Sequence, residues 1–179
     1  LEFIRANRQR PFFLYYPTII PHVALHVPDE ELQPYLQLGW EDPPFVRSSG
    51  YGYTPHFTPR AAYAAMITRM DQDVGRILDL LQELDMAGRT LVIFSSDNGP
   101  EIGAGKAGDL KGYKTHLFEG GIRSPLIVWG PGLVEEAAKG TRNKESVFAA
   151  IDLVPSLIEL SGAGAPEGVE YDGENLLDT

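Results

Sequence analysis

Two adjacent polar residues, Asp97 and Asn98, follow a short apolar run in the segment TLVIFSSDNG, residues 90–99. A carboxylate beside a side-chain carbonyl offers two hard oxygen ligands, which suit Ca²⁺ or Mg²⁺ better than a thiophilic metal. Asp-Asn-Gly is also a common turn, because these residues tolerate positive φ and bond to their own backbone. The two residues by themselves therefore leave both a metal site and a plain turn open.

Other side chains have the chemistry to handle an anion. His22 comes directly after Pro21, and its imidazole could donate to an anionic oxygen or protonate a leaving group. Lys114 lies in KGYKTHLFEGG, residues 111–121, together with Lys111 and His116, and an ammonium group is a compact charge suited to a sulfuryl or phosphoryl oxygen. Loop histidines are often incidental and lysines are often merely solvated, so these functional assignments also stay open.

A long amphipathic helix should precede the Asp97 segment. Thr58 is a plausible N-cap, Pro59 suits the first helical position, and Gly88 is a typical C-terminal residue. Apolar residues recur at three- and four-residue spacing between them, namely Ala62, Ala65, Met66, Met70, Val74, Ile77, Leu78, Leu81 and Leu84. Residues 90–96, which follow, have the composition of a central parallel strand.

The rest of the chain alternates between the two kinds of element. We expect strands at residues 11–19 and 124–130, a short helix at 29–37, and a helix at 146–160 kinked at Pro155. Glu119-Gly120-Gly121 could be a turn, with Arg123 pairing Glu119 or a helix carboxylate. The alternation predicts an α/β fold with a mostly parallel sheet flanked by helices. Ligands bind beyond the carboxyl ends of such strands, where the Asp97 and His22 segments would meet.

Composition narrows the classes of function. The 179 residues are 43% hydrophobic, enough for one domain, and no uninterrupted apolar stretch is long enough to cross a bilayer. The net charge of -10 argues against nucleic-acid binding, and zero cysteines exclude disulfides, thiolate metal sites and cysteine nucleophiles within these residues. The chain has no initiator methionine and ends just after a turn-like segment. We expect one partial domain, residues 1–179, truncated at both ends.

The combination and order of these segments resemble the type I sulfatases of the alkaline phosphatase-like superfamily, from about Pro11 to Leu177. PFFLYYPTIIPHVALHVP resembles the family's strand and histidine loop, with a proline, Pro28, six residues after His22. RAAYAAMITRMDQDVGRILDLL and TLVIFSSDNG resemble its long helix and metal strand. KTHLFEGGIRSPLIVWGPG keeps the family's interval from lysine to Glu-Gly-Gly, which selects Lys114 over Lys111. AIDLVPSLIELSG and YDGENLL resemble the region that follows.

The resemblance implies an alkaline phosphatase-like (sulfatase) fold, here incomplete, and a role for each matched residue. Asp97 and Asn98 would bind the divalent cation, usually Ca²⁺ with Mg²⁺ possible, while His22 and Lys114 would be catalytic and contact the sulfate. His116 is a further predicted substrate-binding residue, although it has no firm counterpart in the family. The family's nucleophile is a formylglycine made from Cys or Ser in a Pro-Ser-Arg context that these residues lack. We therefore expect the segment alone to be inactive.

The sequence thus predicts a sulfuric ester hydrolase acting on a small-molecule or glycan sulfate ester, with the formylglycine supplied from outside the segment. Two alternatives stay open: a phosphonate monoester or phosphodiester hydrolase of the same superfamily, and a non-catalytic fragment. Family resemblance suggests a periplasmic, secreted or lysosomal location, which no residue here reveals. Residues 38–58, rich in aromatics, could be one of the variable loops that select the substrate.

Overall fold

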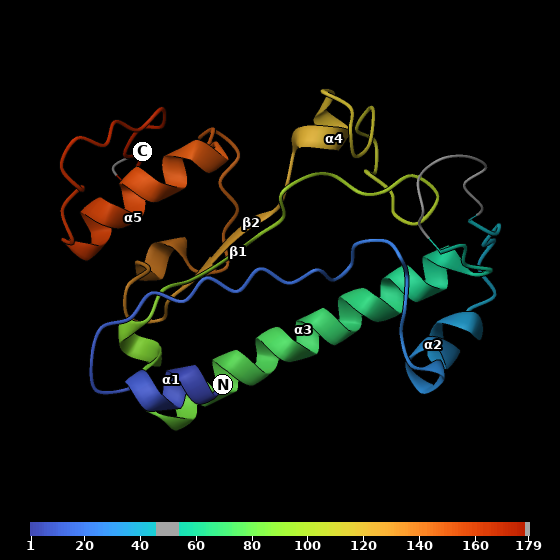
Figure 1. Ribbon diagram of the computed structural model, residues 1–179, viewed down its shortest axis with the longest axis horizontal. Helices are drawn as coiled ribbons and strands as arrows, with labels where there is room; N and C mark the ends of the chain where they lie inside the picture. Colours follow the sequence, from blue (N-terminus) through green and yellow to red (C-terminus); the bar gives the residue numbers. More distant parts are fainter. Residues whose placement is uncertain (46–53, 178–179) are drawn as a thin grey trace. The chain divides into compact units, whose positions relative to one another are not determined.

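The computed structural model describes residues 1–45 and 54–177, and the chain divides into two compact units, Leu1–Val134 and Glu135–Thr179 (Figure 1). The first unit contains α1 (Glu2–Asn7), α2 (Asp29–Leu36), α3 (Pro59–Glu83), a 3-10 turn (Ala87–Arg89), β1 (Val92–Ser95), α4 (Glu119–Ile122) and β2 (Leu126–Trp129). The second contains two 3-10 turns (Glu136–Ala138 and Ala150–Asp152) and α5 (Leu153–Ser161). Of the helices in the described ranges, none has the length and apolarity that a bilayer crossing requires.

The long helix α3 begins where the sequence predicts. Pro59 occupies its first turn and Thr58 is the N-cap residue, although the Thr58 side chain makes no capping hydrogen bond. The carboxylate of Asp42 caps the helix instead, because it accepts the backbone N–H groups of Arg60 at 2.8 Å and Ala61 at 2.9 Å. A side chain distant in sequence thus satisfies donors that a helix start would otherwise leave unpaired.

The predicted end of this helix at Gly88 is wrong. The helix stops at Glu83, and Asp85 adopts the left-handed conformation, with φ of 54°. The backbone N–H of Met86 then donates to the carbonyl of Leu81 at 2.8 Å, as in a Schellman motif. Met86 is buried against Leu81, so apolar packing fixes the helix end at a residue other than glycine.

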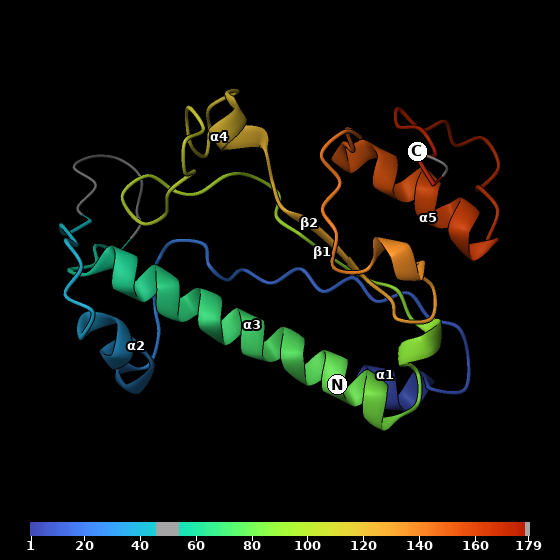
Figure 2. The same ribbon diagram turned by 180° about the vertical axis from the view of Figure 1, so that it is seen from behind.

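Two apolar clusters lie at opposite ends of α3. The helix α2 packs beside its N-terminal half and α1 lies near its C-terminal end, as opposite views show (Figures 1 and 2). The first core consists of Val23, Leu25, Phe45, Ala62, Met66 and Ala104, and the second of Ile4, Leu80, Leu81 and Met86. The first core gathers four segments that are separate in the sequence, and these include the loops around the predicted site residues.

The two described strands pair differently from the prediction. β1 and β2 are antiparallel, with Val92 opposite Trp129 and Ser95 opposite Leu126. Apolar runs predict burial but contain no information about strand direction. The connection between these strands holds only the four-residue helix α4, whereas a parallel crossover usually needs a helix long enough to span the sheet. The chain instead turns back on itself through glycine-rich loops.

The predicted strand at residues 11–19 is also not formed. This segment runs as an open trace and belongs to no β-ladder within residues 1–45 and 54–177 (Figure 1). Several of its apolar side chains face solvent, including Phe13 at 74% and Ile19 at 84% exposure. The composition favours a strand, but a strand exists only when a neighbour supplies hydrogen bonds.

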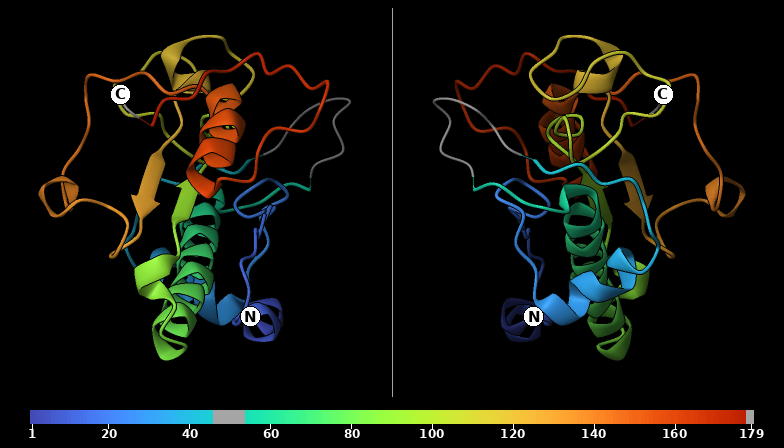
Figure 3. Two further views of the ribbon diagram at one scale, coloured as in Figure 1. Left: turned by 90° about the vertical axis from the view of Figure 1, so that its left-hand side faces the viewer. Right: turned by 90° about the vertical axis from the view of Figure 1, so that its right-hand side faces the viewer.

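In the second unit, the predicted helix at 146–160 is shorter than expected. α5 begins at Leu153, so Pro155 lies in its first turn, where it costs no hydrogen bond and no kink is seen (Figure 3). The buried carboxylate of Asp152 accepts the backbone N–H groups of Ala149 at 2.8 Å and Glu174 at 3.0 Å. Asp152 thereby fastens the C-terminal tail to the start of α5.

Candidate functional site

Asp97 and Asn98, hereafter the donor pair, follow directly after β1. The Ser95 hydroxyl donates to the carbonyl of Pro125 at 2.9 Å, which ties the end of β1 to the start of β2. Ser96 donates to the backbone carbonyl of Asn98 at 3.0 Å, and the Asn98 amide donates to the Asp97 carboxylate. The segment is thus a turn in form, and the turn brings the two oxygen-bearing side chains into contact. The turn and the metal-site interpretations are compatible.

The donor pair fits a hard divalent cation in its chemistry but does not make a complete site. Its groups are one carboxylate and one amide, which suit Ca²⁺ or Mg²⁺. Within residues 1–45 and 54–177, no group of three or more His, Cys, Asp and Glu side chains gathers as a metal site. Ca²⁺ takes about six to eight oxygen ligands, so the donor pair can supply only a minority of them.

The loop that carries Lys114, residues 111–121, is fastened to the segment just after the donor pair. The backbone N–H of Gly99 donates to the carbonyl of Gly121 at 2.8 Å. The backbone N–H of Lys114 donates to the carbonyl of Pro100 at 3.0 Å. The second bond joins the Lys114 backbone to Pro100, which lies two residues after Asn98. The structure therefore brings the backbone segments of three predicted site residues together.

Glycines allow this close approach. A Cβ atom on Gly99 would lie 1.9 Å from the carbonyl oxygen of Gly120, and one on Gly121 would lie 2.0 Å from that of His116. A Cβ on Gly120 would lie 2.3 Å from the carbonyl oxygen of Gly112. Backbone contacts this short exclude any side chain, so Gly120 and Gly121 are packing positions, and they lie in the short helix α4 rather than in the expected turn. Both glycines are buried.

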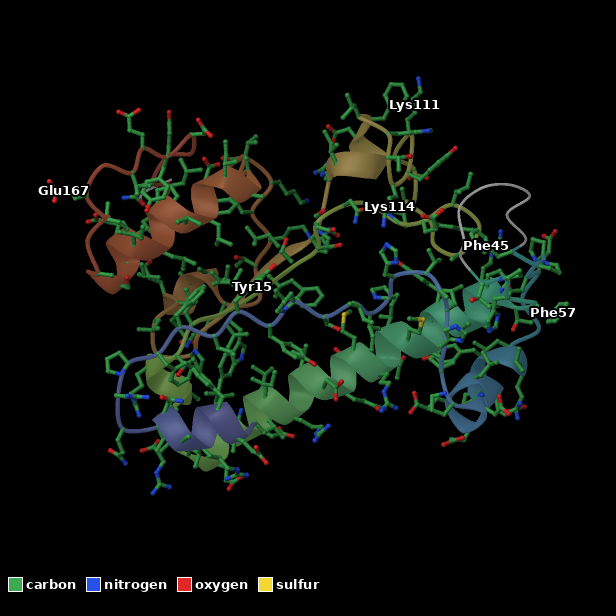
Figure 4. All side chains as sticks on the ribbon, in the orientation of Figure 1. Tyr15, Phe45, Phe57, Lys111, Lys114 and Glu167 are labelled. Atoms are coloured by element: carbon green, nitrogen blue, oxygen red, sulfur yellow. The ribbon has the colours of Figure 1, made fainter. Side chains whose placement is uncertain are left out.

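The two lysines of this loop have different surroundings. Lys114 is half-buried and Lys111 is exposed, and the two lie well apart along the loop (Figure 4). The Lys111 ammonium lies 3.9 Å from the centroid of the Phe118 ring. The predicted ion pair between Arg123 and Glu119 is confirmed, with 3.4 Å between Nη1 and Oε2.

His116 lies among aromatic side chains. Its ring centroid is 4.1 Å from that of Tyr113, at an interplanar angle of 34°. The Phe118 ring stands edge-on to the imidazole, with the centroids 6.1 Å apart. His116 is thus packed within its own loop, an arrangement without a periodic sequence signal that could have predicted it.

His22 is connected to the other site residues indirectly. Its side chain is exposed, its Nδ1 contacts the carbonyl of Val23, and its backbone N–H donates to Ile19 at 2.7 Å. The next residue, Val23, and then Leu25 are buried in the first core together with Ala104. Ala104 lies in the loop that follows the donor pair, so apolar packing links the histidine loop, residues 20–28, to that loop.

Tyr63 of α3 is a site-supporting residue that the sequence did not single out. A Cβ on Gly105 would lie 2.6 Å from the Pro100 side chain and 3.2 Å from the Tyr63 ring, so the loop after the donor pair rests on α3. Burial raises the pKa of Tyr63, and the phenol is therefore neutral at physiological pH. Tyr63 falls within the periodic part of α3, which predicted only core packing.

Known proteins are similar to this chain in sequence and in overall fold. Ps i-CgsB, solved in complex with k-i-k-neocarrahexaose, superposes with a TM-score of 0.79 at 30% identity, covering 97% of this chain and 35% of that one. The family model "Sulfatase" matches residues 1–163. The chain is 33% identical to human N-acetylgalactosamine-6-sulfatase, covering 100% of this chain and 30% of that protein. It is 30% identical to human steryl-sulfatase, covering 98% and 27%.

These matches define an α/β fold of the alkaline phosphatase-like class, which confirms the predicted fold class. The chain belongs to the sulfatase family. It spans about 30% of the length of the curated relatives it matches.

Proposed function

We propose that the full-length protein is a sulfuric ester hydrolase in which the donor pair, Lys114 and His22 contribute to one active site. The observation that carries the proposal is the fastening of the Lys114 loop to the chain beside the donor pair, through the bonds from Gly99 to Gly121 and from Lys114 to Pro100. These backbone bonds support the proposal because they hold the loop that carries the Lys114 cation against the segment after the donor pair, in a chain of the sulfatase family.

Each residue would have a distinct task. The Lys114 ammonium would contact the sulfate oxygens and stabilise charge that grows on them in the transition state. His22 would donate a proton to the departing ester oxygen. The donor pair would hold a divalent cation, Ca²⁺ or Mg²⁺, with ligands from outside the 179 residues. When bound, the cation would neutralise the sulfate, and a formylglycine from elsewhere in the protein would supply the nucleophile.

The substrate proposed is a sulfate ester of a glycan or small molecule. Support comes from the relatives, which include an N-acetylgalactosamine-6-sulfatase and a steryl-sulfatase, and from the similar structure of Ps i-CgsB in complex with k-i-k-neocarrahexaose. A net charge of -10 makes a local cation necessary for binding such an anion. The half-buried Lys114 beside the donor pair would supply that local charge.

The first test substitutes Lys114 in the full-length protein. Lys114→Ala should lower kcat/KM for an aryl sulfate by about 100-fold to 1,000-fold, as loss of one oxyanion-stabilising donor does. Lys106→Ala is the matched control, because Lys106 is an exposed lysine earlier in the same connection. Retention of wild-type kcat/KM by Lys114→Ala would refute the assignment.

His22 can be tested through the leaving group. A general acid matters most when the departing alkoxide is a strong base, so His22→Ala should slow hydrolysis of an alkyl or sugar sulfate more than that of p-nitrophenyl sulfate. His26→Ala, an exposed histidine in the same loop, is the control. Equal losses for both leaving groups would contradict proton donation by His22.

Comparing hydrolysis of an aryl sulfate with that of matching phosphorus esters tests whether the enzyme is a sulfatase or a phosphoryl-transfer hydrolase. The full-length protein should hydrolyse an aryl sulfate in preference to the matching aryl phosphate monoester, phosphodiester and phosphonate monoester. A preference of more than about 100-fold for any phosphorus ester, equivalent to about 2.7 kcal/mol in the barrier, would replace the sulfatase proposal.

A further inference from the structure

Four side chains of the Lys114 loop form a continuous stack, hereafter the clasp: Lys111, Phe118, His116 and Tyr113. The ammonium lies 3.9 Å from the Phe118 centroid, the Phe118 ring meets the imidazole edge-on at 6.1 Å, and the imidazole stacks on Tyr113 at 4.1 Å. Cation–aromatic and aromatic pairs of this geometry are attractive beyond simple burial. Side-chain contacts therefore join Lys111, at the start of the loop, to Phe118, near its end.

Backbone hydrogen bonds also close the loop. The Gly120 N–H donates to the carbonyl of Lys111 at 2.8 Å, and the His116 N–H donates to that of Tyr113 at 2.9 Å. Gly112 has φ of +91°, and a Cβ there would lie 3.0 Å from that of Phe118 and 3.3 Å from that of His116. The clasp thus packs directly on a backbone position that only glycine fills without strain.

Lys114 occupies the tight turn inside this closed loop. It lies between Tyr113, which the clasp includes, and Thr115, whose φ is 77°, an uncommon value for a β-branched residue. A lysine side chain has many rotamers and little intrinsic direction. The position of the Lys114 Cα, and with it the region that the ammonium can reach, is therefore set by the loop backbone. The clasp holds that backbone closed.

We propose that the clasp fixes the position of Lys114, and that His116 is a positioning residue acting through aromatic stacking rather than a group that binds the substrate with its ring nitrogens. The proposal rests on the proposed role of Lys114 at the sulfate. It predicts that an aromatic ring at position 116 is sufficient, whereas direct substrate binding would require an imidazole N–H.

The decisive comparison uses His116→Phe and His116→Ala in the full-length protein, with an aryl sulfate as substrate. His116→Phe should keep kcat and KM within about threefold of wild type, and His116→Ala should lower kcat about tenfold, since small misplacements of a catalytic group are costly. A large rise in KM for both variants would overturn the proposal, because it would indicate contact of the imidazole with the substrate.

A double substitution tests whether the effect passes through Lys114. In a Lys114→Ala background, His116→Ala should cause little further loss of kcat, because there is no ammonium left to position. Losses that simply multiply would show that His116 acts independently and would refute the mechanism. Lys111→Arg should preserve kcat and Lys111→Met should lower it slightly, since only the former keeps a cation over Phe118.

Hydrogen exchange separates failure of this inference from failure of the proposed function. Amides of residues 111–121 should exchange faster in His116→Ala than in wild-type or His116→Phe full-length protein, whatever substrate the enzyme acts on. Unchanged exchange in His116→Ala would overturn the clasp even if the protein proves to be a sulfatase. Faster exchange together with a complete lack of sulfatase activity in the wild type would support the clasp and refute the function.

Discussion

The Lys114 loop and the histidine loop are held in place by different kinds of contact. The Lys114 loop meets the chain after the donor pair backbone to backbone, through glycines where any Cβ would clash. The histidine loop is held by two buried apolar side chains, Val23 and Leu25, inserted into the first core. Backbone contact tolerates almost no displacement, whereas apolar packing can relax around a defect.

This difference predicts how Lys114 and His22, the proposed catalytic residues, respond to mutation. A change at a glycine contact should displace Lys114 by the full size of the clash and affect the chemistry directly. A change in the apolar core should lower the free energy of unfolding while leaving the surviving folded molecules largely competent.

Gly121→Ala should produce the largest loss. Its Cβ would lie 2.0 Å from the backbone oxygen of His116, and neither partner is a flexible side chain. We expect kcat/KM of the full-length protein to fall more than about 100-fold, because displacement of a catalytic group by about 1 Å can cost that much. Steady-state kinetics with an aryl sulfate would measure it.

Gly75→Ala is the matched control for that substitution. Gly75 lies inside α3, and a Cβ there would meet nothing within 4 Å. Alanine is favoured over glycine in a helix interior by about 1 kcal/mol, so this variant should be as stable as wild type or more so. Equal losses of activity in the two variants would contradict the importance of the glycine contact.

Leu25→Ala should destabilise the fold more than it slows the reaction. Leu25 is 1% exposed within the first core, and burial of this kind predicts a loss of about 2–5 kcal/mol in the free energy of unfolding. Urea denaturation of the full-length protein, with kcat measured well below the transition, would check both parts. A severe loss of kcat with unchanged stability would reverse the contrast between the two loops.

The Ca²⁺ affinity of residues 1–179 should be low, because neither the Lys114 loop nor the histidine loop completes the ligand set of the donor pair. The donor pair offers two of the roughly six oxygen ligands that Ca²⁺ needs, so calorimetry on residues 1–179 should detect no micromolar affinity. Full-length protein should bind Ca²⁺ more tightly, and Asp97→Asn should weaken that binding while Asp109→Asn, on an exposed loop, should not. Micromolar binding by residues 1–179 would contradict the partial-site interpretation.

The smallest expected effect concerns an ion pair outside both loops. Hydrogen bonding from Arg5, 2.9 Å away, lowers the pKa of Glu83 from its ordinary value of 4.5. A lowered folded-state pKa adds stability above the unfolded value, and that contribution is lost as the pH falls through the lowered pKa. Thermal unfolding between about pH 3 and pH 6 should show slightly less pH dependence for Glu83→Gln than for wild type.

The sequence predicted elements whose signals are local. The apolar spacing in α3 and its start at Pro59 needed only periodicity and the preference of proline for the first helical turn. Interactions between distant residues were not predictable in this way. Burial of Met86 against Leu81 places the helix end before the predicted Gly88. The antiparallel direction of β1 and β2 depends on the path of the connection between them, which hydrophobic periodicity does not predict.

The candidate site shows the same division. Motif order was sufficient to select the donor pair, His22 and Lys114, and their functional roles stay predictions. The glycine contacts and the clasp were missed, because Gly-Gly predicts a turn and isolated aromatics predict nothing about one another. Gly99 and Gly121 meet through the tertiary fold, and their separation in the sequence gives no sign of that contact.

Residues 11–19 have a practical consequence for work on this protein. Their side chains include Phe13, Tyr15 and Ile19, all at least 74% exposed, on an open backbone that pairs with no strand in the described part of the chain. Such a segment is a template for intermolecular β-pairing. Residues 1–179 expressed alone should therefore tend to aggregate as the concentration rises, and light scattering should detect it. Biophysical measurements on this segment would accordingly need dilute samples.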